Sequence, residues 1–145
     1  MIHILFHHDM PKFEFIEHTA DVAFKAYGKD LNELFANAAE ALESTLVQLQ
    51  RIAPIEIRTI EMASDSYENL LYDWLAELLV MFEVERFAVK HCKLEITGLS
   101  LSAECLGEKI DLDRHVLNEE VKAVTYHNLQ LMKNDIYHVE ITLDV

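Results

Sequence analysis

The sequence predicts an α+β protein with a single domain, in which about six strands form an antiparallel or mixed sheet and two α-helices pack on one face. Two long segments place apolar residues at helical spacing, and several shorter segments alternate apolar and polar residues as strands do. Hydrophobic residues make up 51% of the 145 positions, which suits one compact core. The chain has no internal repeat and no linker-like stretch.

The first helix is expected over residues 31–49. Asp30 stands before it and Glu33 follows three residues later, which is the spacing of a capping box. Asp65 and Glu68 repeat that spacing before a second helix. Its expected apolar face comprises Tyr67, Leu70, Leu71, Trp74, Leu75, Leu78, Leu79 and Phe82. Trp74 is therefore expected in the core, with Asp73 beside that face.

Strands account for most of the remaining chain. The alternation in residues 55–62 shifts phase between Ile57 and Ile60, which is compatible with a bulge. Asn134 and Asp135 are typical of a tight hairpin before the last strand. The strands are expected at 13–17, 22–28, 55–62, 87–97, 100–110, 120–133 and 136–145, and in the last of these Val139, Ile141, Leu143 and Val145 share one face.

Charge restricts the function. The chain has 12 Lys and Arg against 26 Asp and Glu, a formal net charge of −14. Nucleic acids are bound mainly by Lys and Arg that neutralise phosphates, and no segment here is basic, so tight direct RNA binding is not expected. Excess carboxylate suits cationic surfaces or divalent metals, although solubility alone is the simpler explanation.

The expected cellular location and the state of the cysteines depend on sequence signals that this chain lacks. No apolar run approaches the roughly 18 residues of a membrane span, and no signal peptide is evident, so a cytoplasmic protein is expected. Cys92 and Cys105 both fall in strand-like segments without a Cys-x-x-Cys motif. A buried thiol at each position is favoured over a disulfide or a zinc site. Residues 1–12 differ from the rest and are interpreted as an alternative start or a cloning remnant, so the domain is expected at 13–145.

Two segments are candidate metal ligands. The loop from His18 to Asp21 lies between two strands, and the residues alone favour a turn stabilised by Asp21 over a metal loop. At the chain end, the α-carboxylate of Val145 follows the side chain of Asp144. Two such oxygen donors suit calcium, magnesium or manganese if the end is ordered, whereas chain ends usually fray.

Two further stretches are polar without a recognised ligand spacing. The segment 106–115 contains Glu108 and two aspartates but matches neither an EF-hand nor a zinc pattern, so a solvated loop is favoured. On a strand, Lys122, Val124 and Tyr126 would share one face of 120–127, and His127 would lie on the other. The sequence contains no phosphate-binding glycine loop, no nucleophile elbow and no His-Glu-x-x-His motif.

The chain resembles the archease family over residues 13–145. The resemblance is carried by the segments FEFIEHTADVAFKAYG, LLYDWLAELL, LGEKIDLDRH, EVKAVTYH and the ending ITLDV, in this order. It implies a small sheet of about six strands with two helices. The chain departs from the family at its N-terminal extension, and at Val145, where Ile is more common.

The resemblance also implies a function. Archeases are protein cofactors, not enzymes, of the tRNA-splicing RNA ligase, which attaches a guanylyl group to its own active-site histidine before joining RNA ends. The archease promotes guanylylation and multiple turnover, and it broadens the nucleotides that the ligase accepts. The alternatives are a chaperone-like modulator of a nucleic-acid methyltransferase and a metal-dependent hydrolase.

The same resemblance assigns ligands. The family's metal ligands match Asp21, Asp144 and the α-carboxylate of Val145, with calcium as the expected ion and magnesium or manganese as alternatives. The residues considered for supporting or partner-contact roles are His18, Asp73, Glu108, Lys122 and His127.

Overall fold

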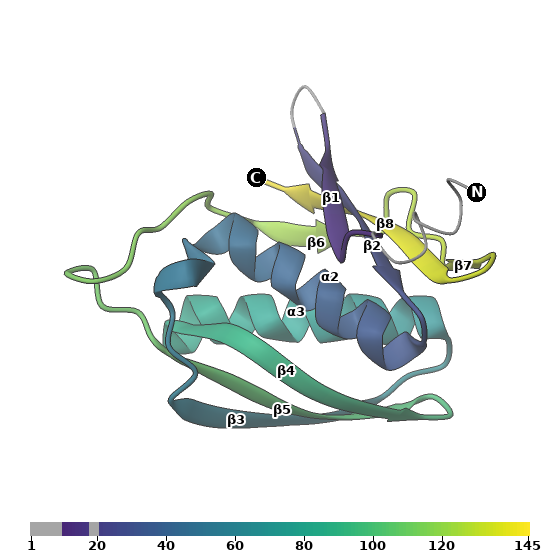
Figure 1. The fold of residues 1–145 in the computed structure, drawn as a ribbon, viewed down its shortest axis with the longest axis horizontal. Coiled ribbons are helices and arrows are strands. Elements are labelled where there is room, and N and C mark those ends of the chain that lie inside the picture. The colour runs from purple at the N-terminus through teal and green to yellow at the C-terminus, as the bar shows by residue number, and fades with distance from the viewer. Residues whose placement is uncertain (1–9, 18–20) are drawn as a thin grey trace.

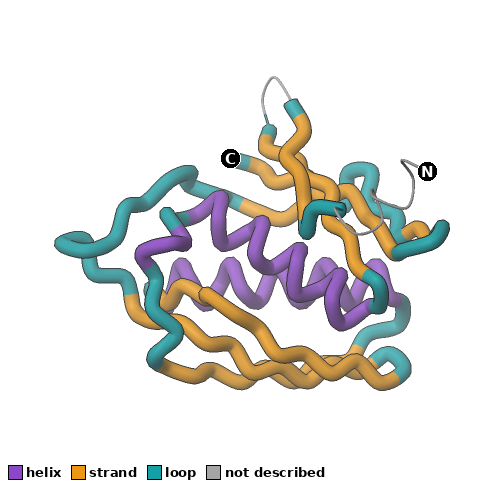
Figure 2. Tube along the Cα trace, viewed as in Figure 1, coloured by secondary structure: helices purple, strands orange, loops and turns teal. Residues whose placement is uncertain are grey.

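The computed structural model describes residues 10–17 and 21–145. Its two α-helices form a layer between two antiparallel sheets (Figures 1 and 2). Helix α2 (Leu31–Leu46) packs on strands of both sheets, and α3 (Tyr67–Glu85) does the same. The α+β class and the two helices are therefore confirmed, whereas the strands are divided between two sheets and do not form one sheet covered on one face.

The first sheet contains the chain end in its interior. Its strands run in the order β1 (Phe13–Ile16), β2 (Val22–Gly28), β8 (Tyr137–Asp144) and β6 (Ala123–Thr125), and β7 (Met132–Lys133) also pairs with β8. Because β8 has a neighbour on each side, the last strand of the chain is hydrogen-bonded along both edges.

The second sheet consists of β3 (Glu56–Ala63), β5 (Ser100–Lys109) and β4 (Phe87–Thr97), with β5 in the middle. The register of β3 on β5 is continuous, so this strand has no bulge between Ile57 and Ile60, although the sequence pattern was compatible with one. A register shift occurs instead in β4, between Val89 and His91. Gly107 lies beside it, where an added Cβ would come within 1.8 Å of the Ala88 carbonyl oxygen, so only glycine fits this close approach.

Local side-chain chemistry determines where both helices begin. The Asp30 Oδ1 atom accepts a hydrogen bond from the Glu33 amide, as the sequence predicts. At α3 the cap is Ser66 and not Asp65: Ser66 Oγ accepts from the Asn69 amide at 3.1 Å. The Asp65 carboxylate binds the Asn69 side chain instead, so the spacing identified the helix start but misplaced its cap by one residue.

Two expected elements are shorter than their patterns suggested. Helix α2 ends at Leu46 and not at residue 49, because Val47 leaves the helix in an extended conformation and bridges Leu117. A 3-10 turn, η1 (Leu49–Arg51), follows. The segment 120–133 is mostly loop around β6 and β7, since Asn128 has a φ of 56° and interrupts the strand.

The core fills the space on both sides of the helical layer. Trp74 is fully buried, as expected, and its Nε1 donates to the Phe35 carbonyl oxygen at 3.0 Å. Val139, Ile141 and Leu143 are buried, whereas Val145 is partly buried. Neither helix in the described part of the chain has both the length and the apolar character that crossing a bilayer requires.

Candidate functional site

The two candidate aspartates lie at the same end of the β2–β8 ladder. Val22 is paired with Leu143, and Asp21 directly precedes Val22 while Asp144 directly follows Leu143. Both aspartates are exposed. The antiparallel register therefore brings together two carboxylates that are more than a hundred residues apart in the chain.

The opposite edge of β8 holds the chain end in place. Asp144 is paired with Ala123 of β6, and the Lys122 amide donates to the Asp144 carbonyl oxygen at 2.7 Å. Val145 packs partly against the core. The end is thus hydrogen-bonded up to its penultimate residue, which is the order that a terminal-carboxylate ligand requires.

The available donors are oxygens of hard-cation type. Within residues 10–17 and 21–145, no three His, Cys, Asp or Glu side chains are grouped as a metal site needs. Asp21 and Asp144 provide two carboxylates, and the third anionic donor of the hypothesis is a main-chain group, the α-carboxylate of Val145. Such a donor set fits calcium, magnesium or manganese better than a soft metal. His18 lies outside the described residues.

Lys122 and His127 flank this region differently. The Lys122 side chain is exposed, and the residue lines a cavity of about 580 Å³ between the end of α3 and the segment 117–122. His127 is exposed, and its main chain is held by two threonines: its amide donates to Thr125 Oγ1, and its carbonyl oxygen accepts from Thr142 Oγ1. Lys122 thus contacts Asp144 by a main-chain hydrogen bond, and the main chain of His127 is held by side-chain hydrogen bonds.

A tyrosine pair that the sequence reading did not identify connects this region to α3. The rings of Tyr72 and Tyr126 stack with centroids 4.0 Å apart, and the Tyr126 hydroxyl donates to Asn69 Oδ1. Burial and the charge of Asp73 raise the pKa of Tyr126. Asp73 is exposed and accepts a long hydrogen bond of 3.5 Å from Ser64. The sequence places Tyr72 on a helix, but it does not show that Tyr126, far away in the same chain, packs against it.

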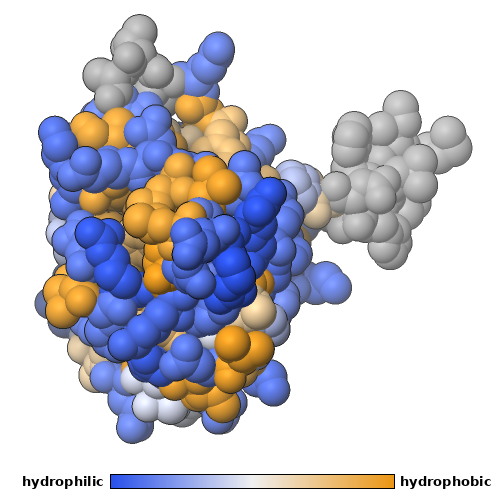
Figure 3. Space-filling model, turned by 90° about the vertical axis from the view of Figure 1, so that its left-hand side faces the viewer, coloured by the Kyte–Doolittle hydropathy of each residue, from blue (hydrophilic) through white to orange (hydrophobic). Residues whose placement is uncertain are grey.

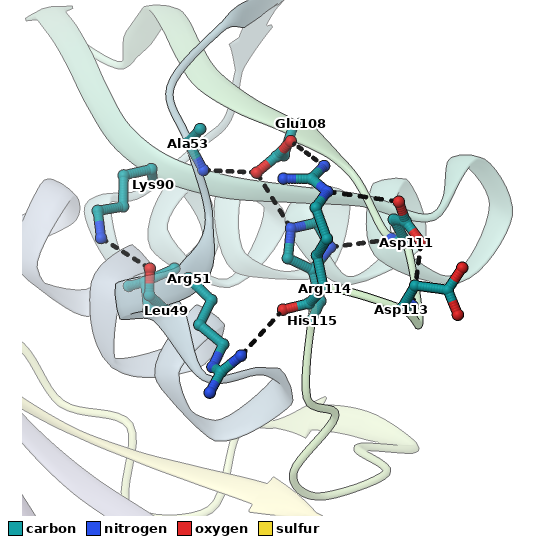
Figure 4. A network of polar contacts seen from close by, with 9 residues as sticks. All are labelled: Leu49, Arg51, Ala53, Lys90, Glu108, Asp111, Asp113, Arg114 and His115. Carbon is teal, nitrogen blue, oxygen red and sulfur yellow. Dashed lines mark hydrogen bonds and ion pairs between the residues drawn. The ribbon is translucent and has the colours of Figure 1, made fainter.

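Glu108 belongs to a separate network at the end of β5 (Figure 4). Its carboxylate accepts hydrogen bonds from the Ala53 amide at 2.6 Å, from Arg114 Nη2 at 2.8 Å and from His115 Nε2 at 3.1 Å. Since His115 Nδ1 accepts from the Asp111 amide, the proton of this imidazole lies on Nε2. The expectation of a solvated loop is thus wrong for Glu108 and His115, which are 2% and 3% exposed.

The charge of Glu108 is stabilised by these donors. Burial opposes ionisation, but the hydrogen bonds from Arg114, the Ala53 amide and His115 outweigh it and lower the pKa of the carboxyl to about 2. The network links the segment 111–115 to the connection before β3. Glu108 therefore shapes a loop and is bonded to neither Asp21 nor Asp144.

The loop that this network shapes forms one end of the molecule, on the left of Figure 1. Figure 3 looks onto that end and shows hydrophobic patches among hydrophilic atoms. The exposed large hydrophobic residues between β5 and β6 are Leu112, Val116 and Leu117. A loop with fixed internal bonds thus presents apolar side chains to solvent.

The fold and the chain end define a class: a small two-sheet α+β protein whose last strand lies inside a sheet and ends in a pair of acidic groups. The model of the Archease protein family matches residues 13–145. The chain belongs to the archease family.

Similar proteins that bear the family's name, and solved structures, agree with this assignment. A protein archease from Sulfurisphaera tokodaii is 37% identical over 132 residues, which cover 90% of this chain and 95% of the relative. A protein archease from Methanosarcina barkeri is 38% identical over 140 residues, which cover 92% of this chain and 96% of the relative. The solution structure of Methanobacterium thermoautotrophicum protein 1598 has a TM-score of 0.77 at 33% identity, covering 92% and 99%. An archease from Thermotoga maritima, described as a possible chaperone, shares the fold with a TM-score of 0.65 at 22% identity, covering 90% and 94%.

Proposed function

We propose that this protein activates a tRNA-splicing RNA ligase, promoting guanylylation of the ligase's active-site histidine and multiple turnover, and that it does so with a divalent cation held at its chain end. Membership of the archease family supports the choice of partner. The observation that carries the site is the register of the β2–β8 ladder, which brings Asp21 and Asp144 to one edge.

In this proposal the chain's own groups provide a rigid acidic site. Asp21 lies directly before β2, Asp144 ends β8 and is followed by Val145, and the Lys122 amide holds the Asp144 carbonyl oxygen. A divalent cation bound there, calcium first and magnesium or manganese as alternatives, supplies positive charge that offsets the charge of nucleotide phosphates. Docking on the ligase would bring this edge to the incoming nucleotide.

The protein is proposed to act as an accessory factor and not as an enzyme. With a net charge of −14, it is expected to leave RNA binding to the ligase. The description of the Thermotoga maritima protein as a possible chaperone agrees with an action on a protein partner. A cytoplasmic location is part of the proposal, and the free thiols of Cys92 and Cys105 support it.

The test compares variants of the chain end in a ligase guanylylation assay. Asp21→Asn, Asp144→Asn and an extension of several residues after Val145 each remove or displace one anionic donor. Each should lower cation affinity by at least about tenfold and reduce guanylylation in parallel. All three changes lie at exposed or terminal positions, so melting temperatures should stay close to that of the parent.

Two control variants separate the site from general effects. Val145→Ile keeps the terminal carboxylate and should retain full stimulation. Glu95→Gln removes an exposed acidic group from β4, in the other sheet, and should also be neutral. Full stimulation by an extended chain that still binds the ligase would contradict the proposed site. If the parent stimulates no ligase but co-purifies with a nucleic-acid methyltransferase, the chaperone-like alternative replaces the proposed function.

A further inference from the structure

The two cysteines lie directly opposite each other on neighbouring strands. Cys92 of β4 is paired with Cys105 of β5, and both residues are free thiols. The neighbouring positions Leu94 and Ala103 are paired in the same register, and Ala103 and Cys105 are buried. The two thiols therefore share the inner face of the second sheet, beneath helix α2.

This placement meets the requirements of a disulfide bond. Directly opposed residues in an antiparallel ladder have Cα atoms about 4.5 to 5.5 Å apart, and disulfides span Cα separations of about 4.4 to 6.8 Å. The Cys105 thiol lies near enough to Cys92 to raise the pKa of the Cys92 thiol. A disulfide bond between them can therefore form while the two strands keep their present register.

A cavity gives small molecules access to Cys92. It has a volume of about 170 Å³, and its lining includes Cys92, Glu43 and Asn37, together with Lys12 and His91. Cys92 is half-buried, whereas Cys105 is fully buried, so the cavity leads to one thiol and the second lies behind it. This is the order in which an attacking and a resolving cysteine are arranged.

The cavity also has an unusual polar wall. The Glu43 carboxyl is buried; its Oε1 accepts from the Val89 amide at 3.0 Å, and its Oε2 has no hydrogen-bond partner among the described residues. A buried polar atom without a partner is costly unless a small polar molecule satisfies it. This atom is itself almost fully covered, so it marks a polar wall of the cavity and is not a binding contact for the oxidant.

We propose that Cys92 and Cys105 are a reversible oxidation site, which forms an intramolecular disulfide with hydrogen peroxide admitted through the cavity between α2 and β4. This goes beyond the proposed function and does not depend on it. A metal site is disfavoured, because no three His, Cys, Asp or Glu side chains are grouped for one in the described part of the chain.

The chemistry balances in two steps. The Cys92 sulfur, as thiolate, attacks one peroxide oxygen; the O–O bond breaks, giving Cys92 sulfenic acid and a hydroxide ion, which takes up the released thiol proton to form water. The Cys105 sulfur then attacks the Cys92 sulfur; the S–O bond breaks, and the departing hydroxide takes the Cys105 proton to form a second water. Peroxide is reduced to two waters, and two thiols are oxidised to one disulfide.

The surroundings of Cys92 determine how readily it reacts. The adjacent Cys105 thiol, burial and the charges of Glu43 and Glu40 on α2 raise the pKa of Cys92 well above the ordinary value. Lys90 and His91 on its own strand and Lys12 complete the charged or titratable lining of the cavity. The thiolate fraction at neutral pH is therefore small, and the pair is expected to respond to sustained exposure to oxidant and not to brief pulses.

The experiment is peroxide treatment of the folded full chain, followed by alkylation in denaturant and intact-mass and peptide mass spectrometry. The expected product is monomeric, has lost two hydrogen atoms, takes up no alkylating agent, and yields a linked peptide pair containing Cys92 and Cys105. Dithiothreitol should restore two alkylation sites per chain.

Variants establish whether the register is responsible. Cys105→Ser removes the resolving thiol, so Cys92 should stop at oxygen adducts. The double variant Ala103→Cys with Cys105→Ser moves the second thiol to the next inward position, diagonal to Cys92, and should lose the intramolecular bond while remaining folded by circular dichroism. Oxygen adducts on Cys92 in the parent with Cys105 still alkylated, disulfide-linked dimers, or no reaction after prolonged exposure would each overturn the proposal.

Discussion

Replacing Glu108 with Gln tests whether the network at the end of β5 stabilises the fold. The variant keeps the size of the side chain but removes the charge that accepts from Ala53, Arg114 and His115. A hydrogen bond to a charged group contributes about 1.5 to 3 kcal/mol, and an amide cannot accept from all three donors with its nitrogen in place of an oxygen. With its oxygen in the place of Oε2, the amide still accepts from Ala53 and His115, but its nitrogen then faces Arg114, which loses this acceptor.

The magnitude can be estimated from the lowered pKa. A fall in the pKa of Glu108 from 4.5 to about 2 corresponds to about 3 kcal/mol of stability. The Arg114 side chain is 54% exposed, so solvent screening reduces this to about 2 kcal/mol. For a chain of this length, the melting temperature of Glu108→Gln should fall by about 4 to 8 °C.

The pH dependence provides a sharper test. Because the folded pKa of Glu108 lies below the unfolded value of 4.5, its contribution is fully present above pH 4.5 and is lost as the pH falls through about 2. Urea unfolding should be measured at pH 7 and 5, above the unfolded pKa, and at pH 4 and 3, between the two pKa values. The free energies of unfolding of the parent and the variant should converge as the pH falls.

Glu104→Gln is the matched control for this experiment. Glu104 lies on the same strand but is exposed on the outer face, opposite Lys93, and its replacement should change stability by less than about 0.5 kcal/mol. If Glu108→Gln is as stable as Glu104→Gln at pH 7, or if its difference from the parent is the same at every pH, the charge of Glu108 does not hold this loop.

Three further predictions follow from other sites. Burial raises the pKa of Glu43 from 4.5 to about 8, so this residue should lower stability progressively as the pH rises from 4.5 to 8; Glu43→Gln, which keeps the acceptor for the Val89 amide, should gain stability relative to the parent in urea unfolding at pH 8 compared with pH 5. Trp74→Phe removes the donor to the Phe35 carbonyl oxygen and leaves a cavity. It should lower the free energy of unfolding by about 2 to 3 kcal/mol, measured by denaturant unfolding followed by circular dichroism. The isolated protein should bind tRNA only weakly at physiological salt, and a sub-micromolar dissociation constant in a gel shift would contradict this.

Helix faces, caps and the last strand could be predicted because their signals are local. The spacing of apolar residues in α3 placed Trp74 in the core, and the alternation of Val139, Ile141 and Leu143 gave the inner face of β8. Asp30 was correctly identified as a cap because its interaction with the Glu33 amide spans three residues. Such patterns depend on neighbours within one or two turns of chain, and a sequence displays them directly.

The candidate site could be predicted only in part from the sequence. Asp21, Asp144 and Val145 were named through a family resemblance, and their residues alone favoured a turn and a frayed end. The sequence does not show which strands become neighbours, so the closeness of Asp21 to Asp144 depends on the β2–β8 register. The same holds for Glu108, whose hydrogen bond to the Ala53 amide joins positions 55 residues apart.

The sequence by itself determined the α+β class, the two amphipathic helices, the acidic character and the family. The tertiary structure alone decided that the strands separate into two sheets with the helices between them, that the chain end lies inside a sheet, and that Cys92 faces Cys105. The physical reason is that a strand's alternation specifies which face is buried but not which strand lies beside it. That choice is made when α2 and α3, which are apolar on more than one side, bury both of those sides at once.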